Sequence, residues 1–388
     1  MPIKNRFAEM LPEITAWRQD FHAHPEILFD CHRTAGIVAD KLRTFGCDEI
    51  VEGIGRTGVV GVIRGKATGS GRVVGLRADM DALPIHEATG APHASKEAGK
   101  MHACGHDGHT AMLLGAAKYL AETRNFAGSV AVIFQPAEEG GGGGLAMVKD
   151  GLMERFGIER VFGMHNLPGL PAGQFALRPG PIMAATAEFV VTVTGKGGHA
   201  ALPHGTVDPI VAASQMVTAL QTITSRNLDP VSALVVSVTK FQAGHAHNVI
   251  PDRAVFSGTI RSLEDSVGAM ARERIGAICQ GIAQAAGATV NIDIDVNYPV
   301  TRNHEAETAL ALSVATGIAG PAAVDGNLPP MMGGEDFSYM LQQRPGAFIF
   351  VGNGDTAGLH NPAYDFNDEI IPSGISYWVA LAETTLAA

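Results

Sequence analysis

The residues with the most evident chemistry lie in one short segment, His102-Ala-Cys104-Gly-His106-Asp107-Gly-His109. Three imidazoles, a thiol and a carboxylate within eight residues are typical of a metal site. Because a single glycine separates Cys104 from His106, both side chains could point at one centre from an extended loop. The alternative is a capping loop whose histidines bond to backbone groups, but the clustering of cysteine with histidine favours the metal site.

A second candidate is the adjacent pair Glu138-Glu139, which is followed by a run of glycines. Such pairs are ordinary on a solvated surface, but at the buried end of a strand they are costly unless one carboxylate meets a cation. Neighbouring side chains of an extended backbone point in opposite directions. One glutamate could therefore bind a metal while the other faces substrate and water, as a general base must.

Acidic or imidazole side chains follow four predicted strands. The strands and the residues after them are 73–77 with Asp79 and Asp81, 130–134 with Glu138 and Glu139, 161–164 with His165, and 347–351 with His360. In an open parallel sheet, ligands bind outside the carboxyl ends of the strands. The sequence therefore predicts one site at one edge of one sheet.

Helices and strands alternate over the first 180 residues, which predicts an α/β domain with a mostly parallel sheet. Its predicted helices are 9–22, 32–45, 110–123 and 145–152, and its one further predicted strand is 59–64. The pattern resumes near residue 300. The later predicted helices are 305–318, 337–341 and 375–386.

The middle of the chain has a different order. The predicted elements are strand 188–194, helix 209–226, strands 231–241 and 253–261, helix 266–286 and strand 289–296. This β-α-β-β-α-β order is that of a ferredoxin-like α+β unit. We therefore predict a discontinuous catalytic domain, 1–183 with 299–388, and an inserted domain over 184–298, with hinges at 179–185 and 297–301.

Composition excludes several classes of protein. A length of 388 residues favours two domains, and a net charge of −11 argues against nucleic acid or an anionic membrane surface as partner. The apolar runs are too short for a membrane span, and the first ten residues lack the apolar core of a secretory signal. The four cysteines lie far apart, so no disulfide framework is expected. The prediction is a reduced, cytoplasmic protein.

Nine segments, in order, resemble the M20 metallopeptidase family. They are WRQDFHAHPE, LRADMDALPI, MHACGHDGHTAMLLGAA, FQPAEEGGGG, FGMHNLP, GGHAALPH, HNVIPDRAVFSGTIRS, MGGEDFSYM and LHNP. The match is to the amidohydrolase branch, which includes hippurate hydrolases, N-acyl-amino-acid amidohydrolases, N-acetyldiaminopimelate deacetylases and plant auxin-conjugate hydrolases. The resemblance implies a zinc-peptidase-like catalytic domain that carries an inserted lid and dimerisation domain.

The resemblance also implies two divalent metal ions per subunit, with Glu138 as general base and Asp79 as the supporting acid. The implied metal ligands are Cys104, His106, Glu139, His165 and His360. Asp81 is a close rival to Asp79. Two-metal relatives outside this branch have His-x-Asp where this chain has Asp79-Met-Asp81, and this departure leaves the identity of the metal open. Zinc suits the thiolate and the imidazoles, manganese is equally open, and cobalt and nickel remain possible.

In the inserted domain, His199 resembles the histidine that polarises the scissile carbonyl, in some relatives from across a dimer interface. Asn248 and Arg261 resemble groups that hold the carbonyl oxygen and the substrate carboxylate. A turn histidine, an Asx-turn asparagine and a surface arginine are the alternatives. Glu335 and Asp336 could cap the helix at 337–341 or face the site, and acids favour the cap.

The implied reaction is hydrolysis of a small N-acyl amino acid to a carboxylate and a free amino acid, in a homodimer or homotetramer. Two alternatives stay open. The chain could be a dipeptidase or carboxypeptidase of the same fold, or a non-catalytic metal- or ligand-binding homologue.

Overall fold

This computed structural model describes residues 5–67 and 71–387, which divide into two compact units. The first unit contains the described residues of Met1–Ile182, Arg302–Pro329 and Asp336–Ala388. The second unit consists of Met183–Thr301 and Pro330–Glu335. Each unit has its own sheet and its own hydrophobic core.

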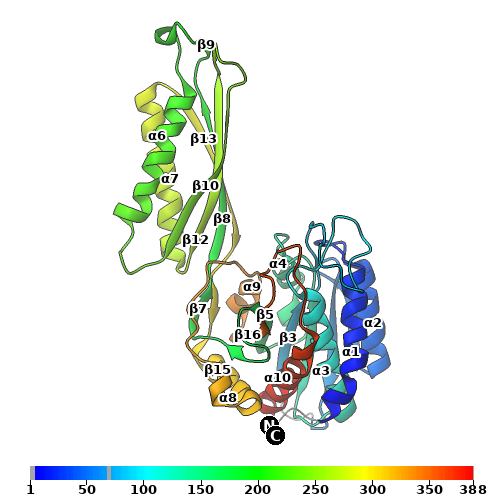
Figure 1. The fold of residues 1–388 in the computed structure, drawn as a ribbon. Coiled ribbons are helices and arrows are strands. Elements are labelled where there is room, and N and C mark those ends of the chain that lie inside the picture. Colours follow the sequence, from blue (N-terminus) through cyan, green and yellow to red (C-terminus); the bar gives the residue numbers. More distant parts are fainter. Residues whose placement is uncertain (1–4, 68–70, 388) are drawn as a thin grey trace. The chain divides into compact units, whose positions relative to one another are not determined.

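The first unit is built on an eight-stranded sheet in the order β1-β2-β4-β3-β5-β16-β6-β15 (Figure 1). Its strands are β1 (Glu49–Ile54), β2 (Gly58–Arg64), β3 (Val73–Asp79), β4 (Ser129–Gln135), β5 (Arg160–Pro168), β6 (Phe175–Ala176), β15 (Val324–Asp325) and β16 (Gly346–Gly354). The four central strands β4, β3, β5 and β16 run parallel. Nearly every residue of β3 and β4 is buried, as expected for parallel strands covered on both faces.

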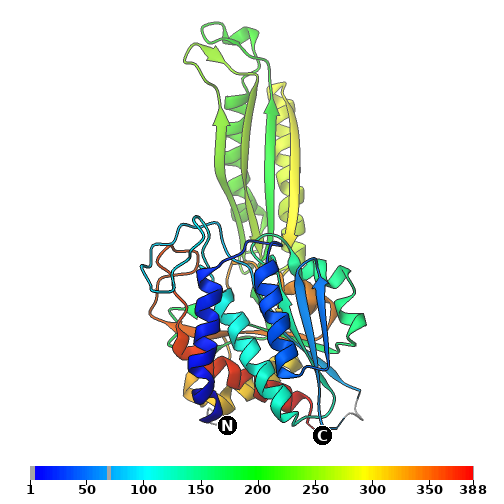
Figure 2. The same ribbon diagram turned by 90° about the vertical axis from the view of Figure 1, so that its right-hand side faces the viewer.

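Helices cover this sheet. They are α1 (Asn5–Ala23), α2 (His32–Phe45), α3 (His106–Thr123), α4 (Gly143–Lys149), α5 (Leu152–Arg155), α8 (Glu305–Ala319), α9 (Ser338–Gln343) and α10 (Ile371–Thr385). The helix α3 packs on β3 and lies between α1, α2 and α10, as Figure 2 shows for the blue and cyan helices. Most of α3 is buried, because its apolar residues surround the helix instead of forming one stripe.

The second unit has a four-stranded antiparallel sheet in the order β10-β12-β8-β13, covered by two helices (Figure 1). Its main elements are β8 (Ala185–Thr194), α6 (Pro209–Thr222), β10 (Leu234–Ala243), β12 (Arg253–Ser262), α7 (Asp265–Ala286) and β13 (Thr289–Tyr298). Buried residues alternate along β12, so one face packs on the helices. A two-stranded ribbon of β9 (Gly198–His199) and β11 (Val249–Ile250) extends this unit. Two short strands, β7 (Gly180–Met183) and β14 (Thr301–Asn303), pair where the chain passes between the units.

The predicted fold class is confirmed: a mostly parallel α/β sheet and a β-α-β-β-α-β unit are both present. Two of the predicted elements differ in their bounds. The helix expected over 145–152 is two helices, because Gly151 takes a left-handed conformation (φ 83°) between α4 and α5. The strand expected from residue 231 begins at Leu234, and Val231 is exposed.

Among the described residues, no helix combines the length and the apolar character needed to cross a membrane.

Candidate metal centre

Five of the predicted site residues meet near the carboxyl ends of the parallel strands. Ligand atoms of Cys104, His106 and Glu139 all lie within 4.8 Å of one another. Cys104 Sγ is 3.4 Å from His165 Nε2, and His360 Nε2 is 3.2 Å from Glu139 Oε1. The geometry therefore brings together all five residues that were predicted to bind metal.

Glycine at position 105 allows the backbone to pass between Cys104 and His106. Gly105 precedes α3 in a left-handed conformation (φ 95°), which non-glycine residues rarely adopt. A Cβ there would lie 2.2 Å from Oδ1 of Asn166 and 2.7 Å from the hydroxyl of Tyr364. The turn thus places the cysteine before the helix and the histidine in its first turn.

The prediction placed His165 after a strand, whereas it lies inside β5, opposite Phe350 of β16. The apolar run 161–164 ends before the strand does, since the polar residues at its end are still hydrogen-bonded to β16. His165 Nδ1 bonds to the backbone carbonyl of Asn166 at 2.7 Å. This bond leaves Nε2 directed toward Cys104.

Negative charge is in excess around His106. Burial opposes its protonation, but the carboxylates of Asp79, Asp81 and Glu139 outweigh burial and raise the pKa of His106 to about 10. Burial, followed by Glu139 and Glu138, raises the pKa of the Cys104 thiol well above its usual value. Such surroundings favour a cation.

Asp79 and Asp81 make two different sets of contacts. Asp81 accepts the backbone N–H of Glu138 through Oδ1 (2.9 Å) and that of Glu139 through Oδ2 (3.0 Å). Asp79 instead pairs with Arg77, whose Nη1 donates to Oδ2 at 2.8 Å. Burial would raise the pKa of Asp79, but His106 and Arg77 hold it well below its usual range.

His109 belongs to the site although it was not predicted there. Its Nδ1 lies 2.6 Å from Asp79 Oδ1, and its Nε2 accepts the backbone N–H of Asn166 at 3.0 Å. The same Nε2 also lies 2.9 Å from Oδ1 of Asn166. Both nitrogens of His109 therefore have close neighbours, and ligand atoms of Asp79, His106, His109 and His165 all lie within 4.8 Å of one another. The spacing of His106 and His109 by three residues on one helix face was the available signal.

Two members of the cysteine–histidine segment turn away from this centre. Asp107 accepts a hydrogen bond from His22 Nδ1 (2.8 Å) and lies 3.6 Å from Nη1 of Arg18. His102 is buried, and burial lowers its pKa to about 3, so it is neutral. Their roles are therefore in the packing behind the centre.

The proposed capping role for Asp336 at the helix beginning near residue 337 is wrong. The N-cap residue of α9 is Phe337, whose side chain makes no capping hydrogen bond. The Asp336 carboxylate instead accepts the N–H of Gly144 in the first turn of α4 (2.7 Å). Asp336 therefore does lie at a helix N-terminus, as acidic residues prefer, but the helix is α4, from a distant part of the chain.

In the second unit, His199 and Asn248 are brought together on the β9–β11 ribbon. His199 pairs with Val249, and Ala200 donates its N–H to the Asn248 carbonyl at 3.0 Å. His199 Nδ1 accepts the N–H of Ala201 (3.1 Å), which leaves the proton on Nε2. Both side chains are exposed.

Arg261 is not brought to this ribbon. The ribbon joins the end of β12 at Arg253, whereas Arg261 lies near the other end of that strand. Eight residues of extended strand correspond to about 26 Å. Arg261 is half-buried, and Nη1 donates to the carbonyl of Ile260 (2.9 Å) and to the Thr259 hydroxyl.

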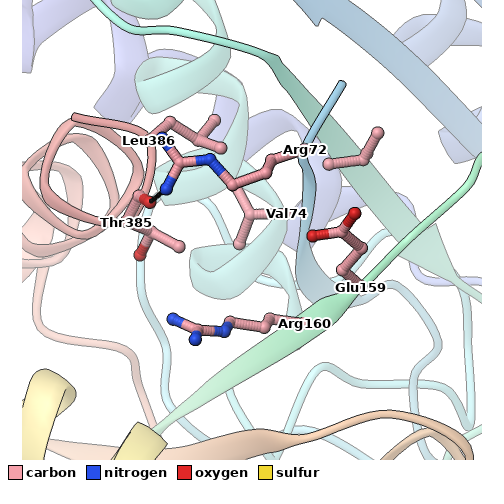
Figure 3. A pocket seen from close by; sticks show the side chains of 7 residues that line it. Arg72, Val74, Glu159, Arg160, Thr385 and Leu386 are labelled. Atoms are coloured by element: carbon pink, nitrogen blue, oxygen red, sulfur yellow. Dashed lines mark hydrogen bonds between the residues drawn. The ribbon is translucent and has the colours of Figure 1, made fainter. Parts of the chain in front are cut away.

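A small cavity in the first unit can be set aside as a substrate site. Its volume is about 70 Å³, and it is lined by Arg72, Val73, Val74, Glu159, Arg160, Thr385 and Leu386 (Figure 3). These residues lie at the starts of β3 and β5 and the end of α10, so the cavity is at the opposite strand ends from the metal centre. Arg72 donates to the Thr385 carbonyl at 3.1 Å.

Comparison with models of protein families shows which family the chain belongs to. The model for "Peptidase family M20/M25/M40" matches residues 75–384. The chain belongs to this family. A hippurate hydrolase from Campylobacter jejuni is 45% identical over 365 residues, which cover 94% of each chain. An N-acetyl-L-cysteine deacetylase from Bacillus subtilis is 40% identical over 359 residues, covering 91% of this chain and 83% of that protein.

A solved M20 structure shares the fold. The Bacillus subtilis YXEP protein, described as a dinuclear metal-binding peptidase from the M20 family, is 34% identical to this chain. Its TM-score is 0.85, with 98% of this chain and 99% of that chain covered. The resemblance inferred from the nine sequence segments is therefore confirmed.

The donors of this M20 chain fit divalent metal ions. Neither ring nitrogen of His106, though fully buried, has a hydrogen-bond partner among the described residues. The carboxylates of Asp81 and Asp79 lie 3.5 Å and 3.7 Å from these nitrogens. A cation bound there would satisfy the imidazole and offset the excess of negative charge. Burial, with His109, holds the pKa of His165 well below its usual range, so this imidazole is neutral, as a ligand must be. The mixture of thiol, imidazole and carboxylate suits a transition metal or zinc better than calcium or magnesium.

Proposed function

We propose that this M20 enzyme hydrolyses the amide bond of N-acyl amino acids of the hippurate type to a carboxylate and a free amino acid. The observation that carries the proposal is the convergence of Cys104, His106, Glu139, His165 and His360. Glu138 is close enough for its charge to raise the pKa of Cys104. A hippurate hydrolase and an N-acetylcysteine deacetylase among its relatives support an acyl amino acid as substrate.

The five converging residues would hold two divalent metal ions, with zinc or manganese favoured and cobalt or nickel possible. When bound, such ions lower the pKa of a water molecule toward neutrality and polarise a carbonyl group. The protein's task is then to orient the ligands and to move protons. The bond between His360 and Glu139 and the bond from His165 to the Asn166 carbonyl support that orientation.

Glu138 is the proposed general base. Its backbone N–H is held by Asp81, and its side chain is 7% exposed, so it is nearly shielded from bulk water. Glu138 takes a proton from the attacking water and returns it to the leaving nitrogen. Asp79 acts indirectly, through His109 and through the charge it places beside His106.

Residues of the second unit complete the proposal. The Nε2 proton of His199 and the amide of Asn248 are suited to a carbonyl oxygen that gains negative charge. The guanidinium of Arg261 is suited to the two oxygens of a substrate carboxylate. About 26 Å of strand separates the ribbon from Arg261, more than a small substrate can bridge. We therefore propose that His199 and Asn248 serve the site of a second copy in a homodimer, or in a tetramer built from such dimers.

On this proposal the second unit is a lid and dimerisation domain inserted into the catalytic domain. The predicted boundaries, 184–298, lie close to the division of the chain at Met183–Thr301. All four cysteines are free, which is consistent with a cytoplasmic location.

One experiment tests the activity directly. Metal-free enzyme is reloaded separately with zinc, manganese, cobalt or nickel, and free amino acid is measured from benzoyl, acetyl and indole-acetyl amino acids and from dipeptides. We expect metal-dependent release from acyl amino acids. Release from dipeptides alone would make the protein a peptidase, and no release with any metal would make it a non-catalytic homologue.

A further inference from the structure

The turn that follows β4 has internal backbone bonds, from Gly140 N–H to the Glu138 carbonyl (2.7 Å) and from Gly143 N–H to the Ala137 carbonyl (3.0 Å), but its conformation is strained. Ala137 is buried in a left-handed conformation (φ 55°), and Gly140 and Gly142 also have positive φ angles (88° and 66°). A left-handed alanine is strained, and glycines have the greatest freedom to take other conformations. Since Glu138 and Glu139 lie in this turn, contacts from elsewhere must keep their backbone in one arrangement.

Two buried carboxylates bind the two ends of the turn. Asp81 accepts the N–H groups of Glu138 and Glu139, as described above. Asp336 accepts the N–H of Gly144 at the far end. A Cβ on Gly144 would lie only 2.8 Å from the backbone oxygen of Asp336 and 3.2 Å from its Cγ. The two segments are thus packed so closely that a shift of one displaces the other.

Asp336 is itself fixed by two further side chains. Its Oδ1 accepts hydrogen bonds from Gln135 Nε2 (2.7 Å) and Arg77 Nη2 (3.1 Å). Arg77 also donates to Gln135 Oε1 (2.9 Å) and to Asp79. Arg77, Gln135, Asp79 and Asp336 are all fully buried. Burying charged groups is expensive, and apolar residues could fill the same volume at less cost.

We propose that Asp336 is a positioning residue that fixes the turn carrying Glu138 and Glu139. Through its bonds with Arg77 and Gln135, Asp336 is connected to the carboxyl ends of β3 and β4, and through Gly144 it is connected to the start of α4. The end of β4 and the start of α4 are the two ends of the segment that holds both glutamates. It holds the backbone of the turn, and a carboxylate oxygen of Asp336 also lies within 4.8 Å of one of Glu138, so it adds negative charge beside the proposed base. The roles of the glutamates rest on the proposed function, whereas the fastening of the turn does not.

The substitution Asp336→Asn tests the fastening. Asparagine keeps the shape but offers one acceptor oxygen, so its NH₂ group must face either the Gly144 N–H or the Arg77 and Gln135 donors. The exchange of amide hydrogens is carried out on the whole protein and is then measured for the segment 137–146 by mass spectrometry. We expect this segment to exchange about tenfold faster or more in the variant. The matched control is Glu307→Gln, a buried carboxylate of α8 that pairs with Arg160 (3.4 Å) at the opposite strand ends. This control should not change exchange in the segment.

Kinetics distinguish positioning from stability alone. At saturating metal, Asp336→Asn should lower kcat for the best acyl amino acid by about 10–100-fold, with KM changing much less, because a displaced catalytic group affects the chemical step. Glu307→Gln should leave kcat within about twofold even if it lowers the thermal unfolding midpoint equally. Exchange or kcat unchanged in folded Asp336→Asn would overturn the proposal.

A milder variant keeps the test decisive if Asp336→Asn does not fold. Gln135→Met removes one donor to Asp336 without leaving a charge unpaired, and should change exchange and kcat in the same direction by smaller factors. No change in either would overturn the proposal. If the wild-type enzyme hydrolyses no amide, the proposed function fails, and the exchange experiment, which uses no substrate, still decides whether Asp336 fastens the turn.

Discussion

In the first unit the candidate catalytic residues are buried among charged partners, whereas in the second unit they stand exposed on short strands. Asp79 and His106 are fully buried and each faces several ionisable groups. His199 and Asn248 are exposed, and the side chain of His199 has one hydrogen bond, from a backbone N–H two residues away. A buried cluster must be assembled completely, since each unpaired group costs free energy. The side chains of an exposed ribbon can gain their contacts later, when substrate or a partner subunit binds.

This difference predicts which substitutions affect metal binding and which affect only turnover. Residues of the buried cluster that bind metal should change both quantities. A base that moves protons, or a side chain on the exposed ribbon, should change turnover and leave metal content intact. The variants below test this separation.

The largest effect is expected for Glu138→Gln. Loss of a general base typically lowers turnover by about 10²–10⁴-fold, and more where the group also positions the water. Bound metal, measured by elemental analysis, should equal that of the wild type, because Glu139 and the other ligands remain. Glu154→Gln, on the exposed end of α5, is the control. Near-full activity in Glu138→Gln would show that the base is another group.

The next largest effect is expected for His199→Ala. Removing one donor to a developing oxyanion costs about 10²–10³-fold in kcat. Metal content should not change, and His204→Ala, on the neighbouring exposed turn, should be close to wild type.

Co-expression of the two inactive chains Glu138→Gln and His199→Ala sharpens the test. If His199 serves the partner's site, the purified heterodimer regains about half of wild-type activity, because one of its two sites is intact. A heterodimer without activity would mean that each subunit supplies its own histidine.

Metal content itself should fall in Cys104→Ala. Loss of groups that merely support a ligand costs about 10–100-fold in metal affinity, so loss of a ligand should cost at least as much. Cys279→Ala, a buried cysteine of α7 in the second unit, is the matched control and should keep its metal. Full occupancy in Cys104→Ala would place this thiol outside the centre.

The same contrast explains what the sequence could predict. Cys104 and His106 were identifiable because ligand residue types cluster in one short segment, and the glutamate pair because it follows a strand whose apolar run is plain. The part played by His109 was not, because it depends on Asn166, 57 residues away. Asp336 was assigned to the wrong helix for the same reason, since Gly144 is 192 residues distant. Local preference identified the residue type, and only the fold identifies its partner.

In the second unit the helices and long strands followed from their hydrophobic patterns, but the ribbon did not. The strands β9 and β11 have two residues each, too few for any periodicity to show. Their pairing depends on backbone bonds such as that from Ala200 to the Asn248 carbonyl. The joint placement of His199 and Asn248 was therefore accessible only through resemblance to relatives.

The smallest expected effect concerns pH and the packing behind the metal centre. Burial opposes protonation of His22, but hydrogen bonds to Asp107 and Glu87 outweigh burial and raise its pKa from 6.5 to about 9. A raised pKa in the folded state means that protonated His22 stabilises the protein fully below pH 6.5, and that this contribution is lost as the pH rises through about 9. Thermal unfolding of metal-free enzyme should therefore show a midpoint that falls by a few degrees more between pH 7 and pH 10 in the wild type than in His22→Gln. His24→Gln, at a partly buried histidine of the same segment that lies 3.4 Å from Asp20, is the control. If the two pH profiles run parallel, His22 is neutral in the folded protein, and Asp107 depends on Arg18 alone for its positive partner.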